Sequence, residues 1–232
     1  MSQEQARRKR LAAECAVADL CDGMTVGLGT GSTADLAIQA LAERVRDGLR
    51  VIGVPTSQRS ADLAGSLGIA LREIGEVERI DVTIDGADEV DPTTLTVLKG
   101  RGGALVREKL VALASEREVI VVDDSKVVAV LGTRAPVPVE VVPFGWRVPA
   151  RALARLGRSV TLRLAPDGAP YLTDNANYVL DVAVDPIPDP AGLAAEIKAI
   201  TGVVDHGLFV GIAHAVYVGT ADGVEVLRRA ER

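Results

Sequence analysis

The sequence predicts an α/β fold, with a Rossmann-like parallel-sheet domain and an inserted ferredoxin-like α+β domain. From residue 25 to about residue 125, short Val- and Ile-rich runs alternate with longer helical patterns, which is typical of βαβ units. After Gly132 comes a proline-rich stretch, 135–149, and then a β-α-β-β-α-β order, which indicates a split βαβ module. We therefore expect residues 1–132 and 207–232 to form the first domain and residues 133–206 the second.

Hydrophobic periodicity places the individual elements. In the first domain it predicts strands at 25–29, 50–55, 81–85, 94–99 and 118–122, and helices at 3–20, 33–46, 59–67 and 104–115. In the second domain it predicts strands at 137–142, 159–164, 177–184 and from 203 onward, and helices at 149–156 and 190–200. The apolar runs 209–218 and 224–227 are expected to return to the first domain.

Two helices have an expected buried face. In the first helix, Leu11, Cys15 and Ala18 share one side. In the helix at 104–115, the i, i+4, i+7 stripe predicts that apolar side chains face the core and that Glu108 points away from it.

Composition excludes several classes of function. A chain of 232 residues with 48% hydrophobic residues buries a sizeable core, and its net charge of −6 opposes nucleic-acid binding as a main role. No run approaches the roughly 20 apolar residues of a membrane span. Cys15 and Cys21 lack the spacing of a disulfide framework, so we expect two reduced thiols in a cytoplasmic protein without membrane attachment.

The first strand ends in a glycine-rich turn that leads directly into a helix. The segment 29–33 reads Gly-Thr-Gly-Ser-Thr, and its glycines let backbone amides approach an anion at a helix start. A dinucleotide site is the competing interpretation, but no acidic residue follows the second strand and the lysine of a P-loop is absent. A small phosphate is therefore the expected ligand of this turn. The alternative interpretation is a turn with a purely structural role.

Two carboxylates follow the third strand, in the sequence Asp85-Gly86-Ala87-Asp88. Paired carboxylates exchange protons with hydroxyls or bind a divalent cation. The spacing matches no EF-hand and no histidine accompanies it, so no metal is expected. An acidic surface turn is the alternative interpretation.

Cationic side chains follow the fourth and fifth strands. Lys99 precedes the loop Gly100-Arg101-Gly102, where a cation stabilises developing negative charge, and Lys126 is placed to hold a phosphate. For Lys126, an ordinary loop lysine is the alternative interpretation.

In combination these segments resemble the type A ribose-5-phosphate isomerase family. The resemblance rests on segments 27–34, 85–89, 99–109 and 123–126, with 138–143, 173–177 and 202–209 as further matches in family order. It implies interconversion of ribose 5-phosphate and ribulose 5-phosphate through an enediolate, in the pentose phosphate pathway. It also implies no cofactor, no metal, and a homodimer or dimer of dimers.

The resemblance also implies roles for individual residues. Glu108 is the expected proton acceptor, Asp85 and Asp88 handle hydroxyl protons and ring opening, and Lys99 stabilises the enediolate. The substrate and its phosphate are bound by residues of four loops and one helix, namely Thr30, Gly31, Ser32, Thr33, Gly86, Ala87, Gly100, Arg101, Gly102, Lys126 and Lys9. Arg101 departs from the family, which usually has glycine there.

Two other functions remain as alternatives. A non-catalytic sugar-phosphate sensor would keep the 30–33 turn without needing Glu108, Asp85 and Lys99 together. A related enzyme acting on an amino-sugar phosphate or a coenzyme A thioester is the other, although no catalytic histidine lies near the strand ends.

Overall fold

A computed structural model describes residues 3–229 of the chain, which form two compact units. The first comprises the described residues up to Ala87, Arg107–Val127 and those from Ile212 onward. The second comprises Asp88–Val106 and Val128–Gly211. The segment after the third predicted strand thus groups with the second unit, whereas the sequence-based division placed it in the first. Residues 1, 2 and 230–232 of that division lie outside the described part.

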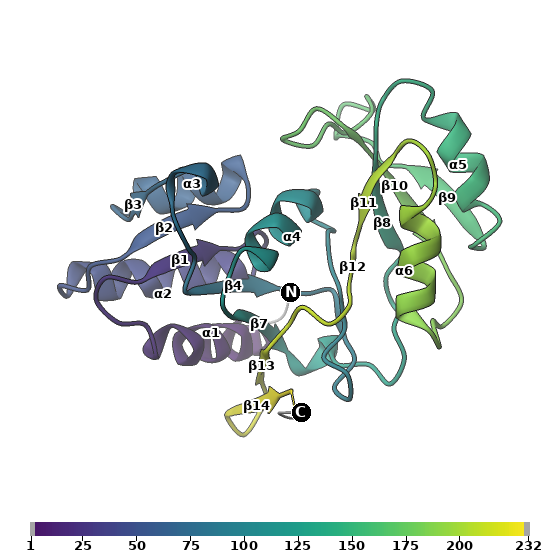
Figure 1. Cartoon of the computed structure of the whole chain (residues 1–232). Coiled ribbons are helices and arrows are strands. Elements are labelled where there is room, and N and C mark those ends of the chain that lie inside the picture. The colour runs from purple at the N-terminus through teal and green to yellow at the C-terminus, as the bar shows by residue number, and fades with distance from the viewer. Residues whose placement is uncertain (1–2, 230–232) are drawn as a thin grey trace. The chain divides into compact units, whose positions relative to one another are not determined.

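The first unit is built on a sheet that runs, within the described residues, in the order β14-β13-β7-β4-β1-β2-β3. All pairings are parallel except that of β13 with β14. The strands are β1 (Thr25–Leu28), β2 (Ile52–Pro55), β3 (Ala70–Leu71), β4 (Val82–Gly86), β7 (Glu118–Asp123), β13 (Ala215–Gly219) and β14 (Val224–Arg228). The Rossmann-like parallel sheet expected from the sequence is confirmed (Figure 1).

Helices cover both faces of this sheet. The apolar cluster of α1 (Gln3–Ala18), α2 (Ala34–Arg46) and α3 (Gln58–Ser66) includes Val26 and Val82 of the strands. On the other face α4 (Leu105–Leu113) packs Val111 against Val54 and Ile80. Because side chains alternate along a strand, each strand residue can be assigned to one of these faces.

The expected buried faces of two helices are wrong. In α4, Glu108 is only 2% exposed, whereas Leu110 and Leu113 are 56% and 65% exposed. In α1 the buried positions include Lys9, Ala13 and Val17, and Cys15 is exposed. The hydrophobic periodicity does not reveal the buried face of either helix, because a charged residue is buried in each and apolar residues lie at the surface.

The second unit contains the ferredoxin-like module. Its antiparallel sheet has the order β11-β8-β10-β9, as expected for a β-α-β-β-α-β chain (Figure 1). The elements are β8 (Val137–Val141), α5 (Arg147–Leu153), β9 (Ser159–Leu162), β10 (Tyr178–Ala183), α6 (Pro190–Lys198) and β11 (Val203–His206). Its core packs Val139, Leu153, Leu180 and Ile197, all with no exposed surface.

One predicted strand belongs to a different sheet. The run at 94–99 contributes β6 (Val97–Leu98), which pairs antiparallel with β5 (Glu89–Val90) and β12 (Leu208–Phe209) instead of joining the parallel sheet. An apolar run predicts a buried strand but not its partner. The remaining short elements are the 3₁₀ turns η1 (Ile74–Glu76) and η2 (Asp124–Lys126).

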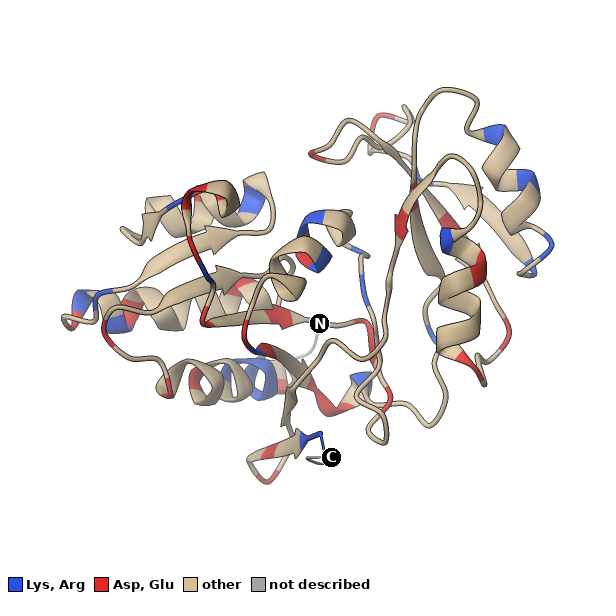
Figure 2. Cartoon of the chain, in the orientation of Figure 1, with Lys and Arg blue, Asp and Glu red and all other residues tan. Residues whose placement is uncertain are grey.

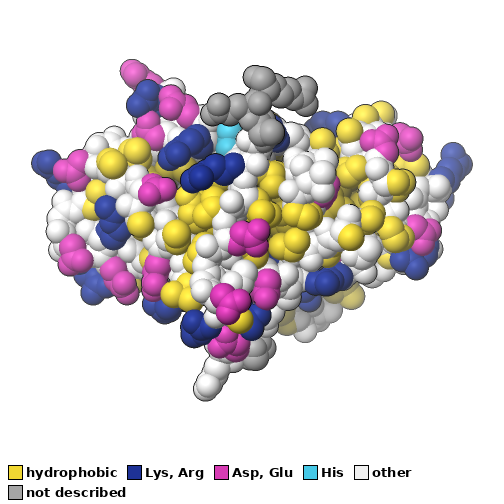
Figure 3. All heavy atoms as spheres, turned by 90° about the horizontal axis from the view of Figure 1, so that it is seen from below, with side chains coloured by type: hydrophobic (Ala, Val, Ile, Leu, Met, Phe, Trp, Pro, Cys, Tyr) yellow, Lys and Arg dark blue, Asp and Glu magenta, His cyan; other side chains and the backbone are white. Residues whose placement is uncertain are grey.

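The surface carries both signs of charge. Acidic and basic residues are both spread over helices and loops (Figure 2), and the face drawn in Figure 3 mixes acidic, basic and apolar side chains. None of the helices in the described residues is long and apolar enough to cross a membrane. Cys15 and Cys21 are exposed and carry free thiols.

Candidate active site

The order of strands in the first unit points to one place on the parallel sheet. The chain runs from β1 outward to β2 and β3, and then returns to place β4 on the other side of β1. In open α/β sheets, ligands bind outside the carboxyl ends of the strands at such a switch point. Here those ends carry Gly29 and Thr30 after β1, and Asp85 in β4.

Asp85 connects these two strand ends. Its Oδ1 accepts the amide of Thr30 at 3.1 Å and that of Gly86 at 2.7 Å, and the residue is 1% exposed. A Cβ at Gly29 would lie 2.3 Å from Oδ1 of Asp85, so only glycine fits beside the carboxylate. The carboxylate is therefore fixed in position by backbone donors.

Hydroxyl groups surround Thr30 on its other side. Its Oγ1 donates to Oγ of Ser57 at 2.7 Å and lies 2.8 Å from Oγ1 of Thr56. Ser57 also caps α3 through Ser60. The sequence did not identify Thr56 and Ser57 as site residues. The segment after the second strand was considered only for the acidic residue of a dinucleotide site, which is absent there. Their signal was two adjacent hydroxyls directly after the second strand.

The glycine-rich turn leads into α2 as predicted. Gly31 has a φ of +114°, a conformation that favours glycine, and its carbonyl accepts the amide of Asp35 at 2.8 Å. Thr33 is the N-cap residue of α2, and a Cβ at Gly86 would lie 3.6 Å from that of Thr33. The turn after β1 and the end of β4 are therefore neighbours.

Glu108 lies on the sheet-facing side of α4. Further along this side, Val111 lies 2.8 Å from where a Cβ of Gly27 would be, and Oγ of Ser115 is 2.6 Å from Oγ1 of Thr83. Gly27 and Thr83 lie opposite each other in the sheet, whereas Ser115 forms a bridge with Ile80, which precedes β4, so α4 runs antiparallel to these strands. With a rise of about 1.5 Å per residue, Glu108 lies about 4.5 Å further toward their carboxyl ends.

Asp85 faces the same side of the sheet. It is two residues after Thr83, and side chains at i and i+2 share a face of a strand. The structure thereby places Asp85 and Glu108 on one face, near the carboxyl ends of β1 and β4.

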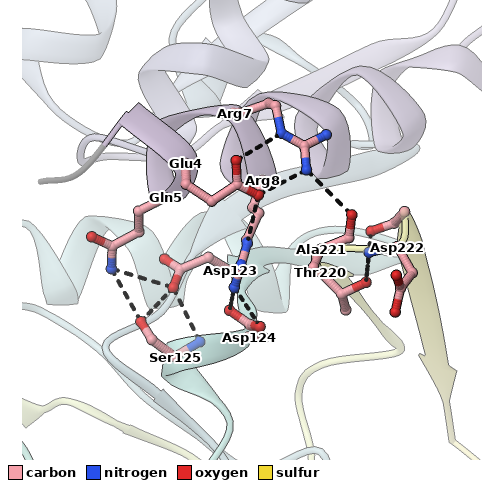
Figure 4. A network of polar contacts seen from close by, with 11 residues as sticks. Glu4, Gln5, Arg7, Arg8, Asp123, Asp124, Ser125, Thr220, Ala221 and Asp222 are labelled. Carbon is pink, nitrogen blue, oxygen red and sulfur yellow. Dashed lines mark hydrogen bonds and ion pairs between the residues drawn. The ribbon is translucent and has the colours of Figure 1, made fainter.

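A second group of polar contacts joins α1 to the end of β7 (Figure 4). Lys9 is 6% exposed, and its Nζ lies 3.3 Å from Oγ of Ser32 and 3.8 Å from Oδ2 of Asp123. Oδ1 of Asp123 accepts hydrogen bonds from Ser125 and from Gln5 (Figure 4). The structure thus brings Lys9 to the turn after β1.

The environment of Asp123 sets its charge. Burial raises its pKa, but hydrogen bonds from Ser125 and Gln5 and the positive charge of Lys9 lower it by more, so the pKa lies below its usual value. Asp123 therefore stays ionised and holds the Lys9 ammonium beside Ser32.

Lys126 ends η2, the short turn that follows Asp123, and is half-buried. The same turn is tied to α1 by Arg8, whose Nη1 donates to both carboxylate oxygens of Asp124 at 2.9 and 2.7 Å (Figure 4). The end of β7 thus carries a cation, as predicted, on a turn anchored to α1.

The second unit holds Asp88, Lys99 and the predicted loop at 100–102. Asp88 directly precedes β5, and its Oδ2 accepts the amide of Arg101 at 3.1 Å. Lys99 is 2% exposed, and its Nζ lies 5.1 Å from the centre of the Phe209 ring, within cation–π range. Gly100, with a φ of +104°, directly follows Lys99 in the glycine-rich loop that contains Arg101.

Arg101 fits this loop. Its side chain is exposed and its φ is not positive, so glycine is not required at this position. Gly102 is exposed, and its carbonyl accepts the hydroxyl of Tyr171 at 3.4 Å. Ala87 and Asp88 are half-buried and lie on either side of the boundary between the units.

The site residues are thus found in two groups. The first unit brings together Thr30, Gly31, Ser32, Thr33, Asp85, Gly86 and Lys9, with Glu108 on the same face of the sheet as Asp85. The second unit brings together Asp88, Lys99, Gly100, Arg101 and Gly102. Among the described residues, no group of three or more His, Cys, Asp or Glu side chains is placed to hold a metal ion.

In the first unit, buried carboxylates at a switch point lie near hydroxyls, a glycine-rich turn and a buried ammonium, an arrangement typical of an enzyme that moves protons on a small anionic substrate. The ribose 5-phosphate isomerase A (phosphoriboisomerase A) family model matches residues 52–223. The chain therefore belongs to this family and is an isomerase.

Individual relatives agree along nearly the whole chain. Ribose-5-phosphate isomerase A of Thermomicrobium roseum is 58% identical over 224 residues, which is 97% of this chain and 94% of the relative. That of Gloeobacter violaceus is 56% identical over 94% of this chain and 95% of the relative.

Solved structures show the same fold. Ribose 5-phosphate isomerase A of Methanocaldococcus jannaschii has a TM-score of 0.92 at 42% identity, covering 96% of this chain and 99% of that one. A D-ribose-5-phosphate isomerase in complex with phospho-erythronic acid has a TM-score of 0.93 at 38% identity, covering 96% and 98%.

Proposed function

We propose that this chain interconverts D-ribose 5-phosphate and D-ribulose 5-phosphate through an enediolate, in the non-oxidative pentose phosphate pathway. We propose further that it acts in the cytoplasm as a homodimer or dimer of dimers, without metal or cofactor. The observation that carries the catalytic proposal is the fixed carboxylate of Asp85, which lies on the same sheet face as the buried Glu108.

Glu108 is the base in this proposal. In the open-chain aldehyde, its carboxylate takes the proton from C2, and the electron pair of that bond moves into a C1–C2 double bond while charge develops on the carbonyl oxygen. Return of the proton to C1 gives the ketose. Because a proton beside a carbonyl is a far weaker acid than a carboxylic acid, the step needs stabilisation of the enediolate.

Three other residues complete the reaction. The proton on the C2 hydroxyl must leave and one must reach the C1 oxygen, which is the role we assign to Asp85 and Asp88, together with ring opening. Lys99 is assigned to the developing negative charge. Its burial supports this role, because an ammonium interacts more strongly with an anion away from water.

The phosphate is assigned to the turn at 30–33, with Lys9 and Lys126. Lys9 beside Ser32, and the amides at the start of α2, offer positive potential to an anion. The complex of a relative with phospho-erythronic acid supports this substrate class. That ligand is phosphorylated, and its carboxylate carries negative charge as an enediolate does.

The direct test is an NMR assay of the chelator-treated protein with ribose 5-phosphate. We expect signals of ribulose 5-phosphate to grow to a constant ratio, at a rate proportional to protein concentration. Substrate binding without turnover would instead support the sugar-phosphate sensor. Turnover that EDTA abolishes and a divalent metal restores would contradict the metal-free mechanism.

A further inference from the structure

An arginine of the second unit is held in a fixed geometry by one carboxylate. Arg163 follows β9, and its Nε and Nη2 donate to the two oxygens of Asp181 at 2.9 and 2.5 Å. Asp181 lies in the middle of β10, and the two side chains are 16% and 24% exposed. Such a two-pronged pair restricts the plane and the direction of the guanidinium group.

The third nitrogen of Arg163 contacts the glycine-rich loop at 99–103. Its Nη1 donates to the carbonyl of Gly100 at 3.1 Å and to that of Arg101 at 3.0 Å. The ring of Tyr171 lies 6.0 Å from the guanidinium carbon, and its hydroxyl donates to the carbonyl of Gly102. Three successive carbonyls of the loop are therefore held by side chains of the module's β9–β10 region.

Holding a carbonyl also orients the amide beyond it. In a trans peptide the C=O and the following N–H lie in one plane and point in opposite directions. Since the carbonyl of Gly100 is directed at Arg163, the amide of Arg101 points away from it. There the Oδ2 of Asp88 accepts that amide at 3.1 Å. A continuous path of contacts thus runs from Asp181 through Arg163 and one peptide group to Asp88.

The loop needs such an anchor. Gly100 and Gly103 have φ values of +104° and +81°, and glycine loses more conformational freedom on ordering than any other residue. Substitution at Gly103 is blocked, since a Cβ there would lie 2.4 Å from the Tyr171 hydroxyl. All of these anchoring contacts within the loop use backbone atoms, which explains why the exposed Arg101 side chain is tolerated.

We propose that Arg163, oriented by Asp181, is a positioning residue that sets the geometry of the 99–103 loop and, through the Arg101 amide, of the Asp88 carboxylate. The proposal rests on the function proposed above, because it matters for turnover only if Asp88 and Lys99 act on the substrate. Arg163 itself acts through the loop and contacts no reacting atom.

The test compares Arg163→Met with Arg158→Met. Arg158 is a matched control in the same unit, because it also pairs with a carboxylate, Asp185, and donates to a carbonyl, that of Val184, but does not contact the loop. We expect Arg163→Met to lower kcat about 10- to 100-fold with little change in KM, since small displacements of catalytic groups cost rate. Arg158→Met should retain wild-type kcat.

A second measurement does not depend on activity. Hydrogen–deuterium exchange at the Arg101 amide should be faster in Arg163→Met than in the wild type, and unchanged in Arg158→Met. Arg163→Lys keeps the charge but cannot form the two parallel hydrogen bonds to Asp181. Asp181→Asn removes the carboxylate that orients the guanidinium group. Both should give intermediate exchange and intermediate kcat, and they replace Arg163→Met if that variant does not fold.

The outcomes separate the two proposals. Wild-type exchange at Arg101 in the Arg163 variants, or equal losses of kcat in Arg158→Met, would overturn the positioning role. If the wild type does not isomerise ribose 5-phosphate, the proposed function fails, and the exchange experiment alone decides whether Arg163 orders the loop. Faster exchange with unchanged kcat would show that the loop geometry does not serve catalysis, and would overturn the inference.

Discussion

The amide of Thr30 donates to Oδ1 of Asp85 across the gap between the ends of β1 and β4. The same oxygen accepts the amide of Gly86, so backbone donors from both strand ends hold one carboxylate. A carboxylate held in this way needs no reorganisation when a substrate hydroxyl arrives, which favours proton transfer.

Asp85→Asn tests this carboxylate. The amide oxygen can still accept both backbone hydrogen bonds, so the variant should fold, while its ability to take a proton is lost. We expect turnover to fall about 10²- to 10⁴-fold in a steady-state assay.

Asp81→Asn is the matched control for that variant. Asp81 precedes the same strand, and its Oδ2 accepts the amide of Thr25 of β1 at 2.7 Å, at the opposite end of the sheet. It should leave turnover near the wild-type value. Equal losses in both variants would assign the effect of Asp85→Asn to the sheet and not to the site.

Lys126→Ala is expected to weaken substrate binding more than catalysis. The proposed contact is to the phosphate, which carries the same charge in ground and transition states, so KM should rise about tenfold while kcat changes little. Lys198→Ala removes an exposed lysine of the second unit and should leave KM unchanged. An unaltered KM in Lys126→Ala would remove this residue from the phosphate site.

Acid should loosen the contact between α1 and the end of β7. The pKa of Asp123 lies below its usual value, because hydrogen bonds from Ser125 and Gln5 and the charge of Lys9 outweigh the effect of burial. A depressed pKa in the folded state stabilises the protein above the unfolded pKa of about 3.9, and this stabilisation is lost as the pH falls through the folded value.

The measurement is urea unfolding of the wild type and Asp123→Asn at pH 7 and near pH 3. At pH 7 the variant should be less stable by about 1–3 kcal/mol, and the difference should shrink at the lower pH. Asp124→Asn, which alters a surface ion pair with Arg8, should cost less at pH 7. A cost of Asp123→Asn that is equal at both pH values would refute the linkage.

Much of the fold could be predicted, because its cues are local. The Val- and Ile-rich strands, and the glycines of the 29–33 turn leading into α2, give each element a signature within a few residues. The family resemblance supplies roles for residues such as Lys99. Its burial, at 2% exposed, could not be predicted from the residue type, because lysines usually lie at the surface.

The features missed from the sequence depend on partners far along the chain. The pairing of β6 with β5 and β12 cannot be inferred from an apolar run of a few residues. The periodicity of α4 was misread because Leu110 and Leu113 are exposed while Glu108 takes a sheet-facing position. Arg163 has no motif, and its link to Gly100 spans 63 residues.

The central claim is that Glu108 transfers the proton between carbons. Glu108→Gln keeps the size of the side chain and removes its basicity, so circular dichroism and phosphate-dependent substrate binding should match the wild type. Glu116→Gln, an exposed glutamate just after α4, is the control and should retain full turnover.

The decisive measurement is the kcat of purified Glu108→Gln for conversion of ribose 5-phosphate, followed by NMR beside the wild type and Glu116→Gln. Since a general base typically contributes about 10²- to 10⁴-fold, we predict a loss of at least 10²-fold in Glu108→Gln alone. A folded Glu108→Gln variant that turns over at nearly the wild-type rate would contradict the account and move the base to Asp85 or Asp88.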